Sequence, residues 1–290
     1  MDAPMCETID QNRRRWLAGA LALTITSLMP GEALAASVFS SRRISVTVHG
    51  SGPDVVMIPG LGSAPSIWQS AIAAVPGYRY HLVQVKGFAG TAAEANASGP
   101  ILEPVAKEIV RYITAMDLRR PRIIGHSMGG TLAMMLAARY PASTGKVMVV
   151  DMLPSGAGMV GGTTSGMGVF AGQLGSYFTG TKGGRQMFRQ LMGMFGPDAA
   201  NNDPDVTAAA LQDLARIDLT AELPKISMPL TVVYATPADA AQRTAIMQRY
   251  SAAYAGAKGV RLKAVGPSGH MIMFDQPQRF AEEVRAFLRG

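Results

Sequence analysis

The chain has 290 residues, of which 48% are hydrophobic and only 16% are charged. This composition excludes an intrinsically disordered protein, and the length fits one large domain or two small ones. The single cysteine, Cys6, excludes a disulfide framework or a cysteine-rich zinc site. The formal net charge is +7, but the basic residues are scattered, which favours a solvated surface over nucleic-acid binding. No apolar run reaches the roughly 18 residues that a membrane-spanning helix needs.

The first 35 residues have the pattern of an export signal. Arg13 and Arg14 precede an apolar stretch from Leu17 to Met29, and residues 33–35 (Ala-Leu-Ala) form a small-x-small cleavage pattern. The arginine pair resembles a twin-arginine signal, with the general secretory route and an ordinary amphipathic helix as the alternatives. We expect cleavage before Ala36, so that residues 36–290 form the mature domain in the periplasm or outside the cell.

From residue 44 onward, short apolar runs alternate with helical patterns. The runs predict strands at 44–48, 54–58, 80–85, 122–124, 146–151, 230–234 and 260–264. Apolar residues at helical spacing predict helices at 67–75, 102–116, 129–139 and 277–288. Strands that alternate with helices indicate an α/β fold, in which a mostly parallel sheet is covered on both faces.

The alternation breaks in the segment of about 153–222, which is rich in glycine and methionine. We expect a helix at 205–218 and another with an apolar face made of Met187, Phe188, Leu191, Met192 and Phe195. Such a long insertion is usually functional, so we interpret it as a helical cap over the sheet. Met187, Phe188 and Met192 are expected to line an adaptable apolar substrate pocket. The alternative is a peripheral insertion that never meets the active site.

The most informative motif is Gly-His-Ser-Met-Gly at residues 125–129, between a predicted strand and a predicted helix. A strand that turns sharply into a helix holds its serine in a strained conformation, with the hydroxyl above the sheet. Side chains at 125 and 129 would collide in such a turn, which explains the two glycines. Ser127 is therefore the candidate nucleophile.

A serine hydroxyl needs a base, and the base needs an acid that orients it. Among the four histidines, His270 lies in a loop between the last strand and the last helix, at the carboxyl edge of the sheet. Two acids follow strands in the same region, Asp239 and Asp151, and both preserve the chain order Ser, Asp, His. We favour Asp239, because Asp151 has an alternative role in anchoring the start of the cap.

A tetrahedral intermediate also needs hydrogen-bond donors for its oxyanion. The backbone N–H after the nucleophile belongs to Met128, and the glycine-flanked loop at 59–63 offers the N–H of Leu61. We expect these two amides to form the oxyanion hole. The alternative for the loop is a plain turn between a strand and a helix.

With these landmarks in order, residues 44–289 resemble the α/β-hydrolase superfamily. The resemblance rests on Pro-Gly-Leu-Gly at 59–62 with Trp68, on residues 125–130, and on Gly-His-Met at 269–271 followed by Gln276, Pro277 and Phe280. It implies an α/β-hydrolase fold with an eight-stranded, mostly parallel sheet, and catalysis without metal or cofactor through a covalent acyl-enzyme. Pro59 and Ala235 depart from the histidine and glycine that are usual at their positions.

The resemblance also narrows the reaction. Ser127 excludes the dehalogenases and epoxide hydrolases of the superfamily, which need an aspartate nucleophile. We expect a hydrolase of carboxylic esters, thioesters or lactones, acting on a small and apolar acyl substrate, with no nucleic-acid partner and no membrane span after signal cleavage. A carbon–carbon bond hydrolase, a perhydrolase and a non-catalytic binding protein of the same fold are the alternatives.

Overall fold

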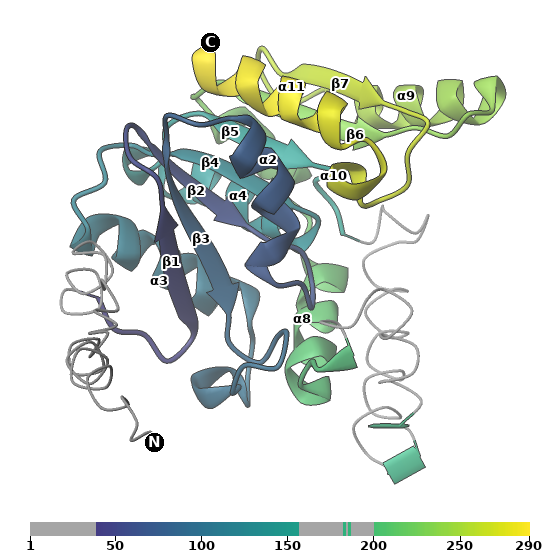
Figure 1. Ribbon diagram of the computed structural model, residues 1–290. Helices are drawn as coiled ribbons and strands as arrows, with labels where there is room; N and C mark the ends of the chain where they lie inside the picture. Colours follow the sequence, from purple (N-terminus) through teal and green to yellow (C-terminus); the bar gives the residue numbers. More distant parts are fainter. Residues whose placement is uncertain (1–38, 157–181, 184, 187–199) are drawn as a thin grey trace, which may run out of the picture.

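The computed structural model describes residues 39–156, 182, 183, 185, 186 and 200–290. Within these residues the chain forms one seven-stranded sheet with the strand order β1-β3-β2-β4-β5-β6-β7 (Figure 1). The strands are β1 (Ile44–His49), β2 (Asp54–Ile58), β3 (Arg79–Val85), β4 (Arg122–His126), β5 (Val147–Val150), β6 (Leu230–Ala235) and β7 (Arg261–Val265). Every predicted strand is present, but the family resemblance implied eight strands, and the described residues supply seven.

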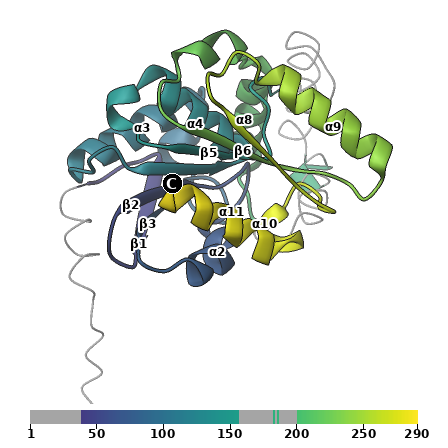
Figure 2. The same cartoon turned by 90° about the horizontal axis from the view of Figure 1, so that it is seen from above.

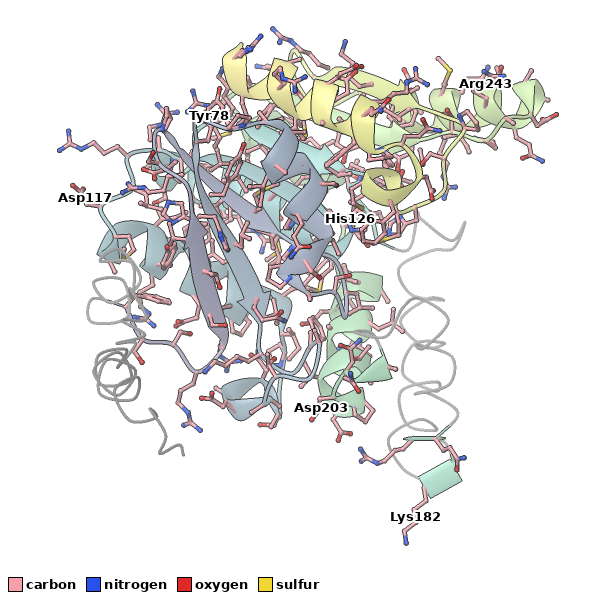
Figure 3. The ribbon with its side chains drawn as sticks, in the orientation of Figure 1. Tyr78, Asp117, His126, Lys182, Asp203 and Arg243 are labelled. Carbon is pink, nitrogen blue, oxygen red and sulfur yellow. The ribbon has the colours of Figure 1, made fainter. Side chains whose placement is uncertain are left out.

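Strand direction decides where functional residues can meet. β1 pairs antiparallel with β3, and all the other pairs are parallel. The carboxyl ends of β2 to β7 therefore share one edge of the sheet, which is where open α/β folds build their sites. Figure 3 shows this polarity, since Tyr78 and Asp117 precede β3 and β4 on one side, whereas His126, the last residue of β4, lies on the other.

Helices cover both faces of the sheet (Figure 2). On one face lie α3 (Leu102–Ala115), α4 (Met128–Arg139), α8 (Pro204–Arg216) and α9 (Ala240–Ala253). On the other lie α2 (Gln69–Ala74), α10 (Ile272–Asp275) and α11 (Pro277–Arg289). Single-turn 3₁₀ helices η1 (Pro65–Trp68), η2 (Glu94–Asn96) and η3 (Pro141–Ser143), and the longer η5 (Thr220–Lys225), complete the described elements.

The core has two parts, one on each side of the sheet. Side chains of α3 and α4 pack on one face, where almost all of α4 is buried. On the second face, the rings of Trp68 and Phe280 stack with centroids 6.2 Å apart and join η1 to α11. β2 and β5 lie in the middle of the sheet and are almost entirely buried, and their sequences are nearly continuous apolar runs, the pattern that predicts buried parallel strands.

Several predicted helices are confirmed with small changes in their bounds. The predicted helix at 67–75 is divided into η1 and α2, and the helix at 205–218 is α8. The helix α9 was not predicted. The proposed signal at 1–35 and the helix with Met187, Phe188 and Met192 lie outside the described residues. None of the helices in the described part of the chain combines the length and the apolar character that a bilayer crossing requires.

Candidate active site

The strand β4 ends in a tight turn that leads directly into α4. Ser127, the residue between the two elements, has φ of +52° and ψ of −120°. A serine rarely adopts this conformation, and it persists only where the surrounding structure imposes it. A Cβ atom at Gly125 would lie 2.0 Å from the Gly129 carbonyl oxygen, and one at Gly129 would lie 2.1 Å from the Ile58 carbonyl oxygen. The expected need for glycine at both positions is therefore confirmed.

Strand pairing places Ser127 next to Asp151. His126, the last residue of β4, is opposite Val150, the last residue of β5. The Ser127 N–H donates to the Val150 carbonyl at 2.9 Å, and Asp151 directly follows Val150, the end of the neighbouring strand. The backbone of Asp151 also has a positive φ, +49°. The serine and the acid thus follow adjacent strand ends at the same edge of the sheet.

His270 reaches this edge from the loop between β7 and α10. Asp275 of α10 holds the loop, because its Oδ2 accepts the Gly269 N–H at 2.7 Å and the Ser268 hydroxyl at 3.3 Å. The side chain of His270 is 44% exposed, and its Nδ1 donates to Asp151 Oδ2 at 2.7 Å. In the tautomer that donates from Nδ1, Nε2 is the ring nitrogen that can accept a proton, as a general base requires.

Asp239, the acid favoured by the sequence, is not the partner of His270 in the structure. It is the N-cap of α9, where its Oδ1 accepts the Gln242 N–H at 2.8 Å, and it is exposed. The structure corrects the preferred pairing, because it is Asp151, the alternative acid, that contacts His270. The physical reason is that the carboxylate of Asp239 is used in capping a helix N-terminus, which aspartate does well.

The surroundings of Asp151 stabilise a carboxylate. Burial alone raises the pKa of Asp151, but hydrogen bonds from His270, from the Ala235 N–H at 2.9 Å and from the Tyr250 hydroxyl at 3.1 Å outweigh it, and the pKa is lowered. The side chain is only 9% exposed. Asp151 is therefore ionised at neutral pH, the state that orients and stabilises a neighbouring imidazolium.

His126 lies beneath the site and does not compete with His270 as a base. Its Nε2 donates to the His270 carbonyl at 3.0 Å, and the two rings have centroids 4.6 Å apart. Burial, and then the nearby His270, lower the pKa of His126 to about 3. The ring is thus neutral, and it links the end of β4 to the loop that bears His270.

The loop after β2 lies against the same residues. The Ser63 N–H donates to the Gly60 carbonyl at 3.2 Å and closes a turn around Leu61. A Cβ atom at Gly60 would lie 2.9 Å from His126 Nδ1 and 3.1 Å from Ser127 Cβ, so only glycine lets the loop approach this closely. Leu61 follows in this turn, and Met128 begins α4, where the first amides have no partner within the helix. Both amides stay candidates for the oxyanion hole.

Comparison with known proteins agrees with this architecture. The family model described as the alpha/beta hydrolase family matches residues 55–283, which include the turn at Ser127, Asp151 and the loop of His270. The chain belongs to the alpha/beta hydrolase family. The expected fold class and the expectation of an enzyme of this family are confirmed.

Similar curated proteins include two esterases. A pimeloyl-acyl-carrier protein methyl ester esterase from Vibrio atlanticus is 27% identical over 208 residues, which is 64% of this chain and 77% of that protein. The protein of the same description from Aeromonas hydrophila is 28% identical over 265 residues, covering 84% of this chain and 99% of that protein.

Solved structures share the fold at lower identity. An esterase from Exiguobacterium antarcticum has a TM-score of 0.70 and 20% identity, covering 85% of this chain and 96% of the other. The enol-lactonase from Burkholderia xenovorans has a TM-score of 0.61 and 20% identity, with the same coverage.

Proposed function

We propose that the protein hydrolyses carboxylic esters, or related acyl compounds such as thioesters and lactones, through Ser127, His270 and Asp151. The observation that carries the proposal is the strained turn at Ser127 beside the bonded pair of His270 and Asp151. Strain of this kind clusters at functional sites. The esterases among the similar proteins support the same class of substrate.

The proposed reaction follows from these positions. The Ser127 hydroxyl attacks the acyl carbon while His270 Nε2 takes its proton, and Asp151 stabilises the resulting imidazolium. The N–H groups of Leu61 and Met128 stabilise the oxyanion. The imidazolium then protonates the leaving alcohol as the carbon–oxygen bond breaks, and water, activated by the same histidine, releases the acid from the acyl-enzyme.

An exposed aromatic residue that follows the proposed base closely in the sequence supports an apolar acyl group. Phe274 in α10 follows His270 by four residues and is 58% exposed. Large apolar side chains at the surface beside a site commonly contact substrate. The expected contacts from Met187, Phe188 and Met192 remain part of the proposal, which a panel of ester, thioester and lactone substrates of increasing acyl length would test.

The direct test is the replacement of the nucleophile. Ser127→Ala should lower kcat by about 10³-fold or more, because the covalent route disappears, and it should abolish labelling by a fluorophosphonate. Ser143→Ala, in the distant η3, is the matched control and should keep both properties. If Ser127→Ala keeps a tenth of wild-type ester hydrolysis, the assignment is wrong; if the wild-type protein is neither labelled nor active, a binding protein of this fold is the better conclusion.

We also infer that the protein is exported and processed. The support is the order of Arg13, Arg14, the apolar stretch and the Ala-Leu-Ala pattern at 33–35 in the sequence. The proposed location of the mature enzyme is the periplasm or the extracellular space.

A further inference from the structure

His270 is not the only group that binds the Asp151 carboxylate. Its Oδ2 faces His270 Nδ1, and its Oδ1 accepts two further hydrogen bonds, from the Ala235 N–H at 2.9 Å and the Tyr250 hydroxyl at 3.1 Å. The first of these donors belongs to β6, the strand next to Asp151. The second comes from Tyr250 of α9, which lies 99 residues after the acid in the chain.

Tyr250 is an exception within its helix. It is the one residue of α9, a helix that the structure describes in full, that is buried. Its ring stacks on Tyr234 of β6, with centroids 4.2 Å apart and an angle of 13° between the planes. The ring of Tyr254 also stacks with that of Tyr250, with centroids 6.4 Å apart. The two aromatic contacts fix the ring, and with it the direction of the hydroxyl group.

We propose that Tyr250 is a positioning residue for the catalytic acid, because its hydroxyl holds the Asp151 carboxylate in the rotamer that presents Oδ2 to His270. This inference rests on the proposed function of Asp151. The Ala235 N–H restrains Oδ1 from the backbone side, and the Tyr250 hydroxyl restrains it from the helix side. A carboxylate held by two donors on one oxygen can turn its other oxygen only toward His270.

The tyrosine is protonated under all conditions in which such an enzyme works. Burial, and then the charge of Asp151, raise the pKa of Tyr250 far above the usual tyrosine range. The hydroxyl therefore always has a proton to donate. Hydrogen bonds to a charged group are among the strongest in proteins, so the loss of this one should be measurable.

The other titratable groups around the pair are few in the described part of the chain. His126 lies against the His270 ring, Tyr254 interacts with the charge of Asp151, and Arg249 interacts with Tyr250. His126 is neutral, and the Tyr254 hydroxyl donates to the Met152 carbonyl at 2.7 Å and not to Asp151. Tyr254 is thus a matched control, since it is an equally buried tyrosine of the same aromatic stack.

The test compares Tyr250→Phe with Tyr254→Phe in the mature protein. Tyr250→Phe keeps the ring and removes one donor from Asp151, so kcat for a p-nitrophenyl ester should fall by roughly 3- to 30-fold. With less stabilisation of the carboxylate, the Asp151–His270 pair should bind a proton at higher pH, and the acid limb of the kcat/KM profile should move upward. Tyr254→Phe should leave kcat and the profile unchanged.

A second measurement does not depend on activity. In spectra of the protein with isotope-labelled histidine, the signals of the His270 ring nitrogens report its tautomer and its bond to Asp151, and His270→Gln identifies those signals. Tyr250→Phe should shift them, and Tyr254→Phe should not. This readout tests the role of Tyr250 even if the wild-type protein hydrolyses none of the esters tried.

Two outcomes would overturn the inference. One is a Tyr250→Phe protein whose acid limb and His270 signals equal those of the wild type. The other is a loss of melting temperature with unchanged pH profile and signals, which would make Tyr250 a packing residue only. Both differ from failure of the proposed function. That failure would appear as a wild-type protein that a fluorophosphonate does not label, or as a Ser127→Ala protein that keeps its activity.

Discussion

Asp151 and Asp239 both follow strands at the same edge of the sheet, but their oxygens have different partners. Asp151 contacts His270, whereas Asp239 caps α9. We predict that Asp151→Asn lowers kcat by about 10²–10⁴-fold, because asparagine cannot stabilise the imidazolium. Asp239→Asn keeps an oxygen acceptor at the N-cap and should retain nearly full activity and stability. Steady-state kinetics and thermal melts of both variants test this prediction. An active Asp151→Asn protein together with an inactive Asp239→Asn protein would restore Asp239, the acid favoured by the sequence.

His126 should make stability depend on pH. Its pKa is lowered to about 3 in the folded protein by burial and by His270, whereas an unfolded histidine titrates near 6.5. Below about pH 6.5 the unfolded chain binds a proton that the folded protein does not, so this contribution to stability is present above that pH and is lost progressively down to about pH 3.

The expected slope is about 1.4 kcal/mol of unfolding free energy per pH unit in that window. Urea unfolding at several pH values should show it as a difference between the wild type and His126→Gln, which keeps a side-chain N–H for the His270 carbonyl. A difference that stays constant from pH 7 to pH 4 would contradict the lowered pKa of His126.

At the scale of elements, α8 is bonded to the body of the domain although it belongs to the predicted cap segment. Asp213 of α8 accepts the N–H groups of Ile101 and Leu102 at 2.7 and 3.0 Å, and so caps the start of α3. At the other end of α8, the Asp203 N–H donates to the Gly87 carbonyl at 2.7 Å. These bonds hold both ends of the helix.

We therefore predict that Asp213→Ala destabilises the protein by about 1–2 kcal/mol, because two amides at a helix start lose their acceptor. Chemical denaturation measures the change. Asp117→Asn is the control, since the Asp117 side chain is 87% exposed. Asparagine, like aspartate, tolerates the positive φ of +49° at this position. Equal stability of the two variants would show that the contact between α8 and α3 contributes nothing to the free energy of unfolding.

The helix α9 shows why one element escaped prediction. Its sequence has no apolar stripe at helical spacing, and only Tyr250 is buried. A periodic stripe is the signal from which amphipathic helices are recognised, so a helix with a single buried residue gives none. The Asp239 N-cap was the remaining local signal, but that residue had been interpreted as a catalytic acid.

At the scale of the whole molecule, export should depend on the arginine pair. Replacing Arg13 and Arg14 with lysines should block processing if the twin-arginine route is used, because that route recognises the arginines themselves. The same change at Arg42 and Arg43, a pair within the described domain, is the matched control. N-terminal sequencing should find Ala36 in the wild type and the control, whereas Met1 on protein from the native host would exclude processing.

Local sequence patterns were enough to predict the seven described strands, most of the helices between them and the turn at Ser127. The strands and the turn are local in origin, since a continuous apolar run specifies a buried strand and paired glycines permit only one kind of turn. The sequence also placed His270 at the right edge, because the carboxyl ends of parallel strands share that edge whatever the details of packing.

The identity of the acid that contacts His270 depends on residues far apart in the chain. Asp151 and Asp239 are equivalent in chain order and in their position after a strand, so no local pattern separates them. The distinction comes from groups distant in the chain: Ala235 and Tyr250 fix one oxygen of Asp151, which leaves the other for His270. A buried carboxylate is stable only where several such donors converge, and their convergence depends on the register of β5 and β6 and on the packing of α9.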